Sequence, residues 1–394
     1  MADLFPPLSG REVHLGNWRQ APHSTWAFQH VNELLPCARM QRARKPVDFS
    51  SSASSVDVMG VYFEGPGGFH GHVRDFFAAS HGQAMVVLQH GKIVSETYRP
   101  GFSDRDVHLV FSISKSFTGL LAGILEAQGQ LNPDDLVTRL VPEAASSAYG
   151  DAKIRHVLDM TVGVHFEEAY LEPGSPFARY REAMGWNPLS DPLNPPDLRS
   201  FLMELPHDGK AHGEVFHYVS PNSDLLGLIV ERAAGAAFST LFETLIWQPM
   251  GAEQDALISL DRLGAPRTAG GMCVSCRDLA RVGEMMRHEG RVADQQIVPQ
   301  AFIKELYSHG EREPWLKGDL LALAPQGHYR NQWYVTGPQG AMMAIGIHGQ
   351  WLYVDPQSGV TIAKFSAQPE PVDDVADQLN LAAFRAIIAA LSTG

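Results

Sequence analysis

The spacing of apolar residues changes along the chain and predicts strands at both ends with helices between them. Residues 84–98, AMVVLQHGKIVSETY, read as two strands around a tight turn at His90-Gly91-Lys92. Near the C-terminus HYRNQWYVTG, AMMAIGIHGQWLYVDP and GVTIAKFSA read as three consecutive strands, and DDVADQLNLAAFRAIIAAL as a closing helix. Further helices are predicted near 112–128, 153–160, 196–205, 221–234, 238–247, 276–289 and 299–308.

This order of elements predicts an α+β fold. One antiparallel sheet is built from the N-terminal and C-terminal strands and is flanked by helices, with a mostly helical domain inserted. We assign 61–130 and 270–394 to the sheet domain and 131–269 to the helical domain, and expect 1–60 to wrap irregularly over the surface. The stretch from about 165 to 195 is rich in Pro, Gly and aromatic residues and is long enough to suggest a functional loop.

The predicted helix in FSISKSFTGLLAGIL carries a misplaced cation. Apolar residues recur at i, i+3, i+4, i+7 and i+8 from Phe117, and small residues occupy the other face, so the helix is expected to be buried on most sides. Lys115 in its first turn meets the positive end of the helix dipole, and burying its charge unpaired is costly. A chemical role would explain a lysine in this position.

Composition and charge exclude several classes of partner. The 394 residues carry 44 acidic and 31 basic side chains, a net charge of −13, which argues against nucleic acid or an anionic membrane surface. No run of about 20 apolar residues predicts a membrane span, and the N-terminus lacks the features of a signal peptide. Three cysteines suggest a reducing cytoplasm, and Cys273 and Cys276 have no second pair to complete a zinc site. No cofactor or metal is expected.

Ser112-Ile-Ser-Lys115 is the candidate catalytic motif, an S-x-x-K. The G-x-S-x-G, H-E-x-x-H and P-loop motifs are absent, and of the eight lysines only Lys115 has a serine three residues before it. Positions i and i+3 share a helix face, so Lys115 can take the proton of Ser112. The helix N-terminus and burial lower the lysine pKa, and the Ser112 N–H can stabilise an oxyanion. The alternative is an N-cap serine beside a lysine that reaches water.

Two later segments favour the catalytic interpretation. Tyr218, in EVFHYVSPN, lies two residues before a helix that Ser220 and Pro221 are expected to begin, and its hydroxyl could relay a proton to a leaving group. Gly346 and Gly349 allow a close approach to the late strand, which could supply a second oxyanion N–H. An ordinary buried aromatic remains the alternative for Tyr218.

Together these motifs resemble the serine β-lactamase and penicillin-binding superfamily, in particular its class C and family VIII esterase branch and the nylon-oligomer hydrolases. The likeness extends over nearly the whole chain, through WAFQHV, SISKS, VLDM, EEAYLEP, FHYVSPNSDLLGLIVER, SCRDLARVGEMM, RNQWY and IGIHGQWLYVDP. It implies a Ser112 nucleophile, a Lys115 base, a Tyr218 proton relay and an oxyanion hole from Ser112 and Ile347. It also implies that Tyr170 closes over the substrate. Further residues match positions around the family's pocket: Arg181, Trp186, Ala269, Tyr334, Ile345 and His348. For Arg181 the alternative is a solvated loop residue, and for His348, which follows Ile347 on a strand that alternates faces, a side chain that points away from the nucleophile.

Departures from that family shape the functional hypothesis. The late strand has no Lys-Thr-Gly, so an efficient β-lactamase is not expected. In the members that hydrolyse the 6-aminohexanoate dimer, an acidic residue tends to stand at the position of Arg181, where it binds the substrate's amine, and a polar residue at the position of Ala269. We therefore predict a cytoplasmic serine hydrolase that cleaves small esters and, weakly, small linear amides. A homodimer is consistent with the resemblance. The alternatives are a 6-aminohexanoate-dimer hydrolase and a non-catalytic ligand-binding protein on the same fold.

Overall fold

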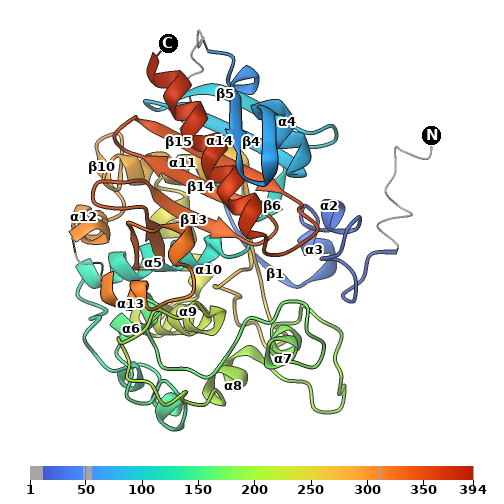
Figure 1. The fold of residues 1–394 in the computed structure, drawn as a ribbon. Helices are drawn as coiled ribbons and strands as arrows, with labels where there is room; N and C mark the ends of the chain where they lie inside the picture. The colour runs from blue at the N-terminus through green and yellow to red at the C-terminus, as the bar shows by residue number, and fades with distance from the viewer. Residues whose placement is uncertain (1–11, 48, 50–55, 309, 311, 394) are drawn as a thin grey trace.

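The centre of the computed structural model is a seven-stranded antiparallel sheet in the order β11-β12-β13-β14-β15-β4-β5. The structure describes residues 12–47, 49, 56–308, 310 and 312–393. The N-terminal half supplies β4 (Gly82–Gln89) and β5 (Lys92–Tyr98), and the C-terminal part supplies the other five strands (Figure 1). The predicted α+β fold, with one sheet built from both ends of the chain, is confirmed.

The C-terminal strands number five, where the apolar pattern predicted three. They are β11 (His328–Arg330), β12 (Trp333–Val335), β13 (Met342–Gly346), β14 (Gln350–Asp355) and β15 (Val360–Ser366). Two predicted strands each contain a tight turn: Asn331 and Gln332 have φ of 51° and 68°, and His348 and Gly349 have 61° and 82°. Two successive residues with positive φ are typical of hairpin turns. The prediction read through both turns because each is only two residues long and is flanked on both sides by strand-like residues.

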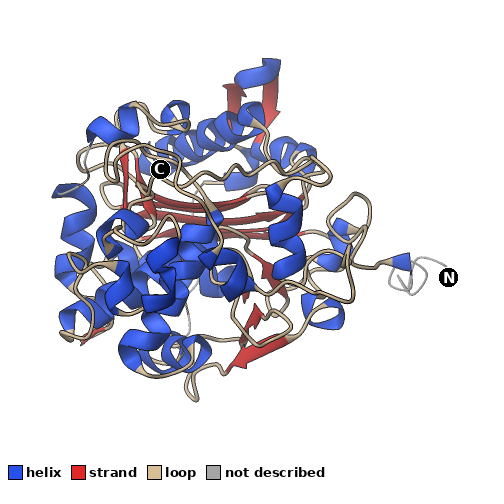
Figure 2. Cartoon of the chain, turned by 90° about the horizontal axis from the view of Figure 1, so that it is seen from below, coloured by secondary structure: helices blue, strands red, loops and turns tan. Residues whose placement is uncertain are grey.

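Both faces of this sheet are covered by helices. Along β14, Leu352 and Val354 point to one face and Trp351 and Tyr353 to the other, as alternation requires. The first face packs on α11 (Cys276–Arg287), and the second on α14 (Asp374–Thr393) and α4 (Val73–Ala79). Figure 2 shows the strands lying between these helical layers. Burial on both faces explains why β14 and β15 are almost uniformly buried.

A second, four-stranded sheet lies beside the first. Its order is β1-β7-β8-β6, formed by Cys37–Met40, Ala256–Ser259, Met272–Ser275 and Val107–Leu109. These strands come from all three regions into which the sequence was divided, and that division stays a prediction. Two small hairpins complete the strands: β2 (Tyr62–Gly65) with β3 (Phe69–His72), and β9 (Arg291–Val292) with β10 (Gln295–Gln296).

Among the remaining helices, the buried α5 (Ile113–Ala127) contacts α9 (Ser220–Ala234) most extensively, and both lie below the main sheet in Figure 1. The others are α2 (Ser24–Ala27), α3 (Val31–Leu34), α6 (Ile154–Leu158), α7 (Pro176–Ala183), α8 (Leu198–Met203), α10 (Phe238–Phe242), α12 (Gln300–Ser308) and α13 (Arg312–Leu316). The described part of 1–60 therefore contains short helices and one strand, although much of it is irregular; residues 1–11, 48 and 50–55 lie outside the described residues.

Three local predictions need correction. The stretch 165–195 is not all loop, because α7 lies within it and Ser175 caps that helix by accepting a hydrogen bond from Ala178 N at 3.2 Å. The helix predicted over 238–247 is α10 followed by a π-helical turn at Glu243–Trp247. Helix α9 begins at Ser220, with Val219 as its N-cap, one residue earlier than expected. Its Ser220 hydroxyl is thereby freed for another contact.

Helix α14 is the one described helix whose length and apolarity would allow it to cross a membrane. Phe384 and Ile387 on one of its faces are fully buried, and the Phe384 ring packs against Trp351 and Tyr353 of β14. These contacts explain the apolar composition of that face by packing within the protein.

Candidate active site

Ser112 lies where β6 passes into α5. Phe111, just before it, has φ of 45° and is fully buried against Phe28 and Trp186, so packing holds a backbone conformation that a phenylalanine rarely adopts. Ser112 occupies the N-cap position, but its side chain makes no capping hydrogen bond. Its Oγ instead lies 2.7 Å from Lys115 Nζ. The cap interpretation therefore does not account for this serine.

Lys115 has the surroundings of a buried neutral amine. Its side chain is 1% exposed, and Nζ lies 2.7 Å from Ser112 Oγ, 3.0 Å from Ser220 Oγ and 2.9 Å from the Ala269 carbonyl. Burial lowers its pKa from 10.5 to about 7. A neutral amine can donate to Ala269 and Ser220 and accept the Ser112 proton, so the three contacts suit a base.

A buried ion pair holds the Ala269 carbonyl in place. Arg267 and Asp224 form a salt bridge, and both side chains are almost completely buried. The other oxygen of Asp224 accepts a hydrogen bond of 2.7 Å from Ala269 N, and Tyr180 also donates to Asp224. This network connects α9 to the segment that carries Ala269, and so fixes one hydrogen-bond partner of Lys115.

Glu168 provides a second support for the site. Its Oε1 accepts a 2.5 Å hydrogen bond from Ser220 N, at the start of α9, and Oε2 accepts one from the Tyr170 hydroxyl. Its charge also favours the protonated form of Lys115, which partly opposes the effect of burial on the lysine pKa. Glu168 thus links Tyr170 to Ser220 and, through it, to Lys115.

Tyr218 lies between Ser112 and a group of aromatic side chains. Lys115 Nζ is 4.9 Å from the centre of the Tyr218 ring, and the Tyr334 ring stacks beside it at 6.1 Å. Burial raises the pKa of Tyr218, and the nearby Glu168 raises it further, while hydrogen bonds with Ser112 and Tyr334 lower it less. The phenol is therefore protonated at neutral pH and can donate a proton.

Ile347 lies in the turn between β13 and β14, not within a strand as predicted. The absence of a side chain at Gly346 lets this turn approach the segment just before Ser112. A Cβ on Gly346 would lie only 2.3 Å from the Val110 carbonyl, so a larger residue is incompatible with this approach. Neither Ser112 N nor Ile347 N donates a hydrogen bond to an acceptor among the described residues. Ser112 and Ile347 line the same two spaces, so their free N–H groups are candidates for an oxyanion hole.

Two connected spaces bring the other candidate residues to Ser112. A cavity of about 570 Å³ is lined by Ser112, Tyr170, Tyr218, Tyr334, Ile345 and Ile347. A narrow space of about 20 Å³ shares Ser112, Tyr170 and Ile347 with this cavity and is lined also by Arg181, Trp186 and Ala269. Every predicted site residue except Lys115 and His348 therefore lines one of these two spaces, and Lys115 contacts Ser112 from the buried side.

His348 differs from its predicted position because it lies in the turn, with φ of 61°, and not on an alternating strand. Its Nδ1 is 2.7 Å from the Gln368 carbonyl, and its ring packs between Phe28 and Phe111. It lines neither space beside Ser112 but a third cavity, of about 560 Å³, which shares Arg19, Tyr170 and Arg181 with the narrow space. Burial lowers its pKa to about 4, so the ring is neutral.

Sequence reasoning missed Glu168, Asp224 and Arg267 as parts of the site, and treated Ser220 only as a helix cap. Asp224 follows Ser220 by four residues and so shares a face of α9 with it, a signal that was available. Glu168 and Arg267 gave no comparable signal, because they contact residues 52 and 43 positions away in the chain.

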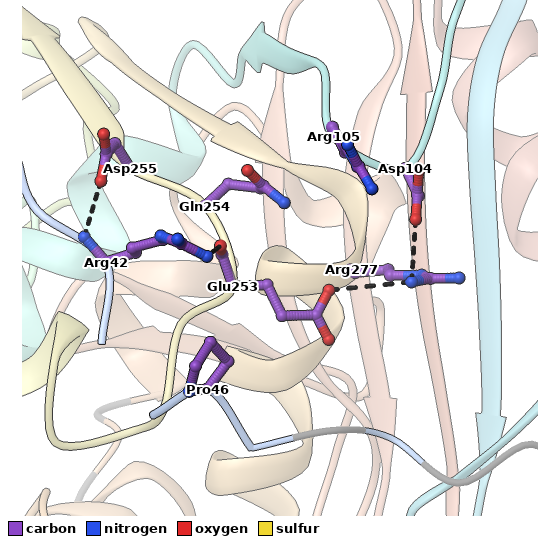
Figure 3. Close-up of a pocket in the computed structure, with 8 residues that line it drawn as sticks. All are labelled: Arg42, Pro46, Asp104, Arg105, Glu253, Gln254, Asp255 and Arg277. Carbon is purple, nitrogen blue, oxygen red and sulfur yellow. Dashed lines mark hydrogen bonds and ion pairs between the residues drawn. The ribbon is translucent and has the colours of Figure 1, made fainter. Parts of the chain in front are cut away.

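A larger cavity, of about 640 Å³, lies elsewhere and is lined by charged side chains (Figure 3). Arg277 there lies between Asp104, at 3.0 Å, and Glu253, at 3.8 Å. None of the described residues that line this cavity is a serine, cysteine, lysine or histidine, and its carboxylates are paired with arginines: Asp104 and Glu253 with Arg277, and Asp255 with Arg39. We therefore place the candidate active site at Ser112.

Comparisons with known proteins agree with this geometry. The model of the Beta-lactamase family matches residues 69–386. A 6-aminohexanoate-dimer hydrolase of Paenarthrobacter ureafaciens is 34% identical over 368 residues, 93% of this chain and 91% of that protein.

Solved structures show the same fold. A Bacillus anthracis structure, provisionally described as a 6-aminohexanoate-dimer hydrolase, has a TM-score of 0.88 at 22% identity and covers 97% of this chain and 98% of its own. A hydrolase with promiscuous acyltransferase activity has a TM-score of 0.63 at 16% identity, covering 80% of this chain and 98% of its own. The chain belongs to the beta-lactamase family and is a serine hydrolase of that superfamily.

Proposed function

We propose that this hydrolase cleaves small carboxylic esters through an acyl-enzyme on Ser112, and small linear amides more slowly. The observation that carries the proposal is Lys115 Nζ, buried and 2.7 Å from Ser112 Oγ, with a pKa that burial lowers to about 7. A non-catalytic binding protein has no need of such a lysine, which costs stability unless it acts as a base.

The proposed reaction uses four groups of the site. Lys115 takes the hydroxyl proton as Ser112 Oγ bonds to the substrate's carbonyl carbon, and the N–H groups of Ser112 and Ile347 stabilise the resulting oxyanion. The bond to the leaving group then breaks, and Tyr218 donates the proton that the departing atom needs while Lys115 returns its proton to the phenol. Water releases the acyl group by the reverse route. None of these proposed steps requires a metal or a cofactor.

An ester is the favoured substrate because an alkoxide or phenoxide leaves with less proton transfer than an amine. A second candidate function is hydrolysis of the 6-aminohexanoate dimer, which is favoured by the 34% identity to the Paenarthrobacter ureafaciens enzyme. Against it stands Arg181, since a guanidinium repels the dimer's ammonium group. Incubation with the dimer, followed by measurement of free 6-aminohexanoate against 4-nitrophenyl acetate turnover, decides between the two.

Ser112→Ala tests the proposal itself. We expect 4-nitrophenyl acetate turnover to fall to background, and a fluorophosphonate to add its mass to Ser112 of the natural protein but not to the variant. Undiminished turnover in the variant, or labelling at another residue, would contradict the assignment. A chromogenic β-lactam serves as a further substrate, and we expect little hydrolysis of it.

The remaining expectations concern where and with what the enzyme acts. We propose a cytoplasmic enzyme on small molecules, with neither nucleic acid nor membrane as a partner. The net charge of −13 supports this, because it disfavours polyanions and anionic lipid surfaces. A homodimer is proposed from the family likeness alone, and sedimentation of the purified chain tests it.

A further inference from the structure

The narrow space beside Ser112 is unusually positive. Arg19, Arg181 and Arg267 line it, and no carboxylate does. Arg267 is neutralised by Asp224. Arg19 and Arg181 form no ion pair with any carboxylate among the residues that the structure describes, although both are half-buried. Two unpaired guanidinium groups therefore face the site from α7 and from the segment after Trp18.

Both arginines are held in place by neutral groups. Arg19 donates to the Trp186 carbonyl at 2.7 Å and to Asn187 Oδ1 at 2.5 Å. Arg181 donates to the Tyr170 carbonyl at 2.7 Å and lies 4.5 Å from the centre of the Phe177 ring. A guanidinium has five N–H donors, so each retains donors for a ligand. These contacts fix the position of the charges without neutralising them.

This positive charge is compensated only in part: the nearby Glu168 carboxylate raises the pKa of Arg181, but it forms no ion pair with that side chain. Burial, and then the charge of Arg181, lower the pKa of Arg19 to about 9, and burial lowers that of Arg181 to about 10. Both arginines also help to lower the pKa of His348. The adjoining cavity of about 560 Å³ continues outward past Arg19, Arg181 and His348, and the carboxylates on it, Glu172 and Glu370, are exposed. An anion next to the two arginines would offset this unfavourable charge.

The position of Tyr218 indicates which part of a substrate would lie here. Tyr218 lines the 570 Å³ cavity but not the narrow space with the arginines. If Tyr218 supplies the leaving group's proton, the leaving group lies in the larger cavity. The acyl chain then extends from Ser112 in the other direction, towards Arg19 and Arg181.

We propose that Arg19 and Arg181 form an anion subsite for the far end of the acyl chain, so that the preferred substrates are half-esters of dicarboxylic acids. This inference rests on the proposed ester hydrolysis at Ser112. A carboxylate receives two parallel N–H donors from a guanidinium, which makes the contact both strong and directional. The subsite opens outward, so chains of several methylene groups can be accommodated.

Three esters of similar length test the proposal: the mono-4-nitrophenyl ester of adipic acid, 4-nitrophenyl hexanoate and 4-nitrophenyl 6-aminohexanoate. We expect kcat/KM for the anionic ester to exceed that for the neutral one by about tenfold or more, and the cationic ester to be poorest. Arg19→Gln and Arg181→Gln should each reduce the anionic-to-neutral ratio by about tenfold, and Arg181→Lys should retain part of it. Half-esters of longer and shorter diacids then give the optimal chain length.

Arg179→Gln is the matched control, since Arg179 is exposed on the same helix and is paired with Glu204 at 2.7 Å. It should leave the ratio unchanged. Equal rates on the anionic and neutral esters, or a preference that survives both glutamine variants, would overturn the anion subsite while leaving Ser112 hydrolysis intact. If the natural protein turns over none of the three esters, the proposed function fails, and the subsite with it.

Discussion

Replacing Lys115 with methionine should abolish activity and yet stabilise the fold near neutral pH. Nearly complete burial lowers the pKa of Lys115 from 10.5 to about 7. In the window between those values the unfolded chain binds more protons than the folded one, so the free energy of unfolding rises with pH. The cost of burying this lysine is therefore fully present below about pH 7 and disappears above 10.5.

The magnitude follows from the same pKa values. The fall from 10.5 to about 7 corresponds to about 5 kcal/mol at low pH, at about 1.4 kcal/mol per pKa unit. Three hydrogen bonds of Lys115, to Ser112, Ser220 and Ala269, each stabilise the folded protein by about 1 kcal/mol. Lys115→Met should thus raise the free energy of unfolding by about 2 kcal/mol below pH 7. From pH 6 to pH 9 the free energy of unfolding of the natural protein should rise by roughly 2.5 kcal/mol relative to that of the variant.

Urea unfolding of both proteins at pH 6, 7.5 and 9 measures this difference, and groups unaffected by the substitution cancel from it. Hydrolysis of 4-nitrophenyl acetate should fall about 10³-fold in the variant. In the natural protein kcat/KM should fall as the pH drops below about 7, because Lys115 then holds a proton. A stability difference that stays constant within about 0.5 kcal/mol from pH 6 to 9 would refute a buried lysine with a lowered pKa.

Three further substitutions test separate contacts of the site. Tyr218→Phe should lower kcat by about 10²-fold or more on an anilide and less on 4-nitrophenyl acetate, and an equal loss on both would argue against a proton relay to the leaving group. Asp224→Asn leaves Arg267 buried without its partner and should cost about 3–5 kcal/mol in urea unfolding; a loss under 1 kcal/mol would show that the pair is dispensable. Gly346→Ala places a Cβ 2.3 Å from the Val110 carbonyl, so kcat should fall because the Ile347 N–H moves, and unchanged kcat would remove Ile347 from the oxyanion hole.

Local patterns predicted those parts of the fold whose cause is local. Helix α5 was predicted because its apolar spacing and small residues reflect burial on all sides, and residues 113–125 are indeed all buried. The turn at Ile347–Gly349 was missed because AMMAIGIHGQWLYVDP is interrupted there only by His348, Gly349 and Gln350, and these few residues were read as part of one long strand. The prediction therefore placed Ile347 and His348 on a strand, whereas they lie in the turn between β13 and β14.

The groups that support the catalytic residues could not be predicted in the same way. The Ala269 carbonyl contacts Lys115 across 154 positions of the chain, and Glu168 contacts Ser220 N across 52. No spacing rule for helices or strands covers such separations, since they depend on how α5, α9 and the β7–β8 segment pack together. Sequence motifs therefore predicted the groups proposed to react, and only the packing showed what holds them.

The charges on the two sides of Ser112 bear on the choice between ester and dimer. The linear 6-aminohexanoate dimer carries an ammonium group on its acyl half and a carboxylate on its amine half. If the leaving group lies beside Tyr218 as proposed, the acyl side presents Arg19 and Arg181, while the cavity on the Tyr218 side is lined by carboxyl groups at Glu167, Glu168, Asp319 and Asp377. Burial raises the pKa of Asp377 to about 7, so one of these is partly neutral, but none is positive. Each charged end of the dimer would thus meet a group of its own sign, whereas an anionic acyl chain with a neutral leaving group meets neither repulsion.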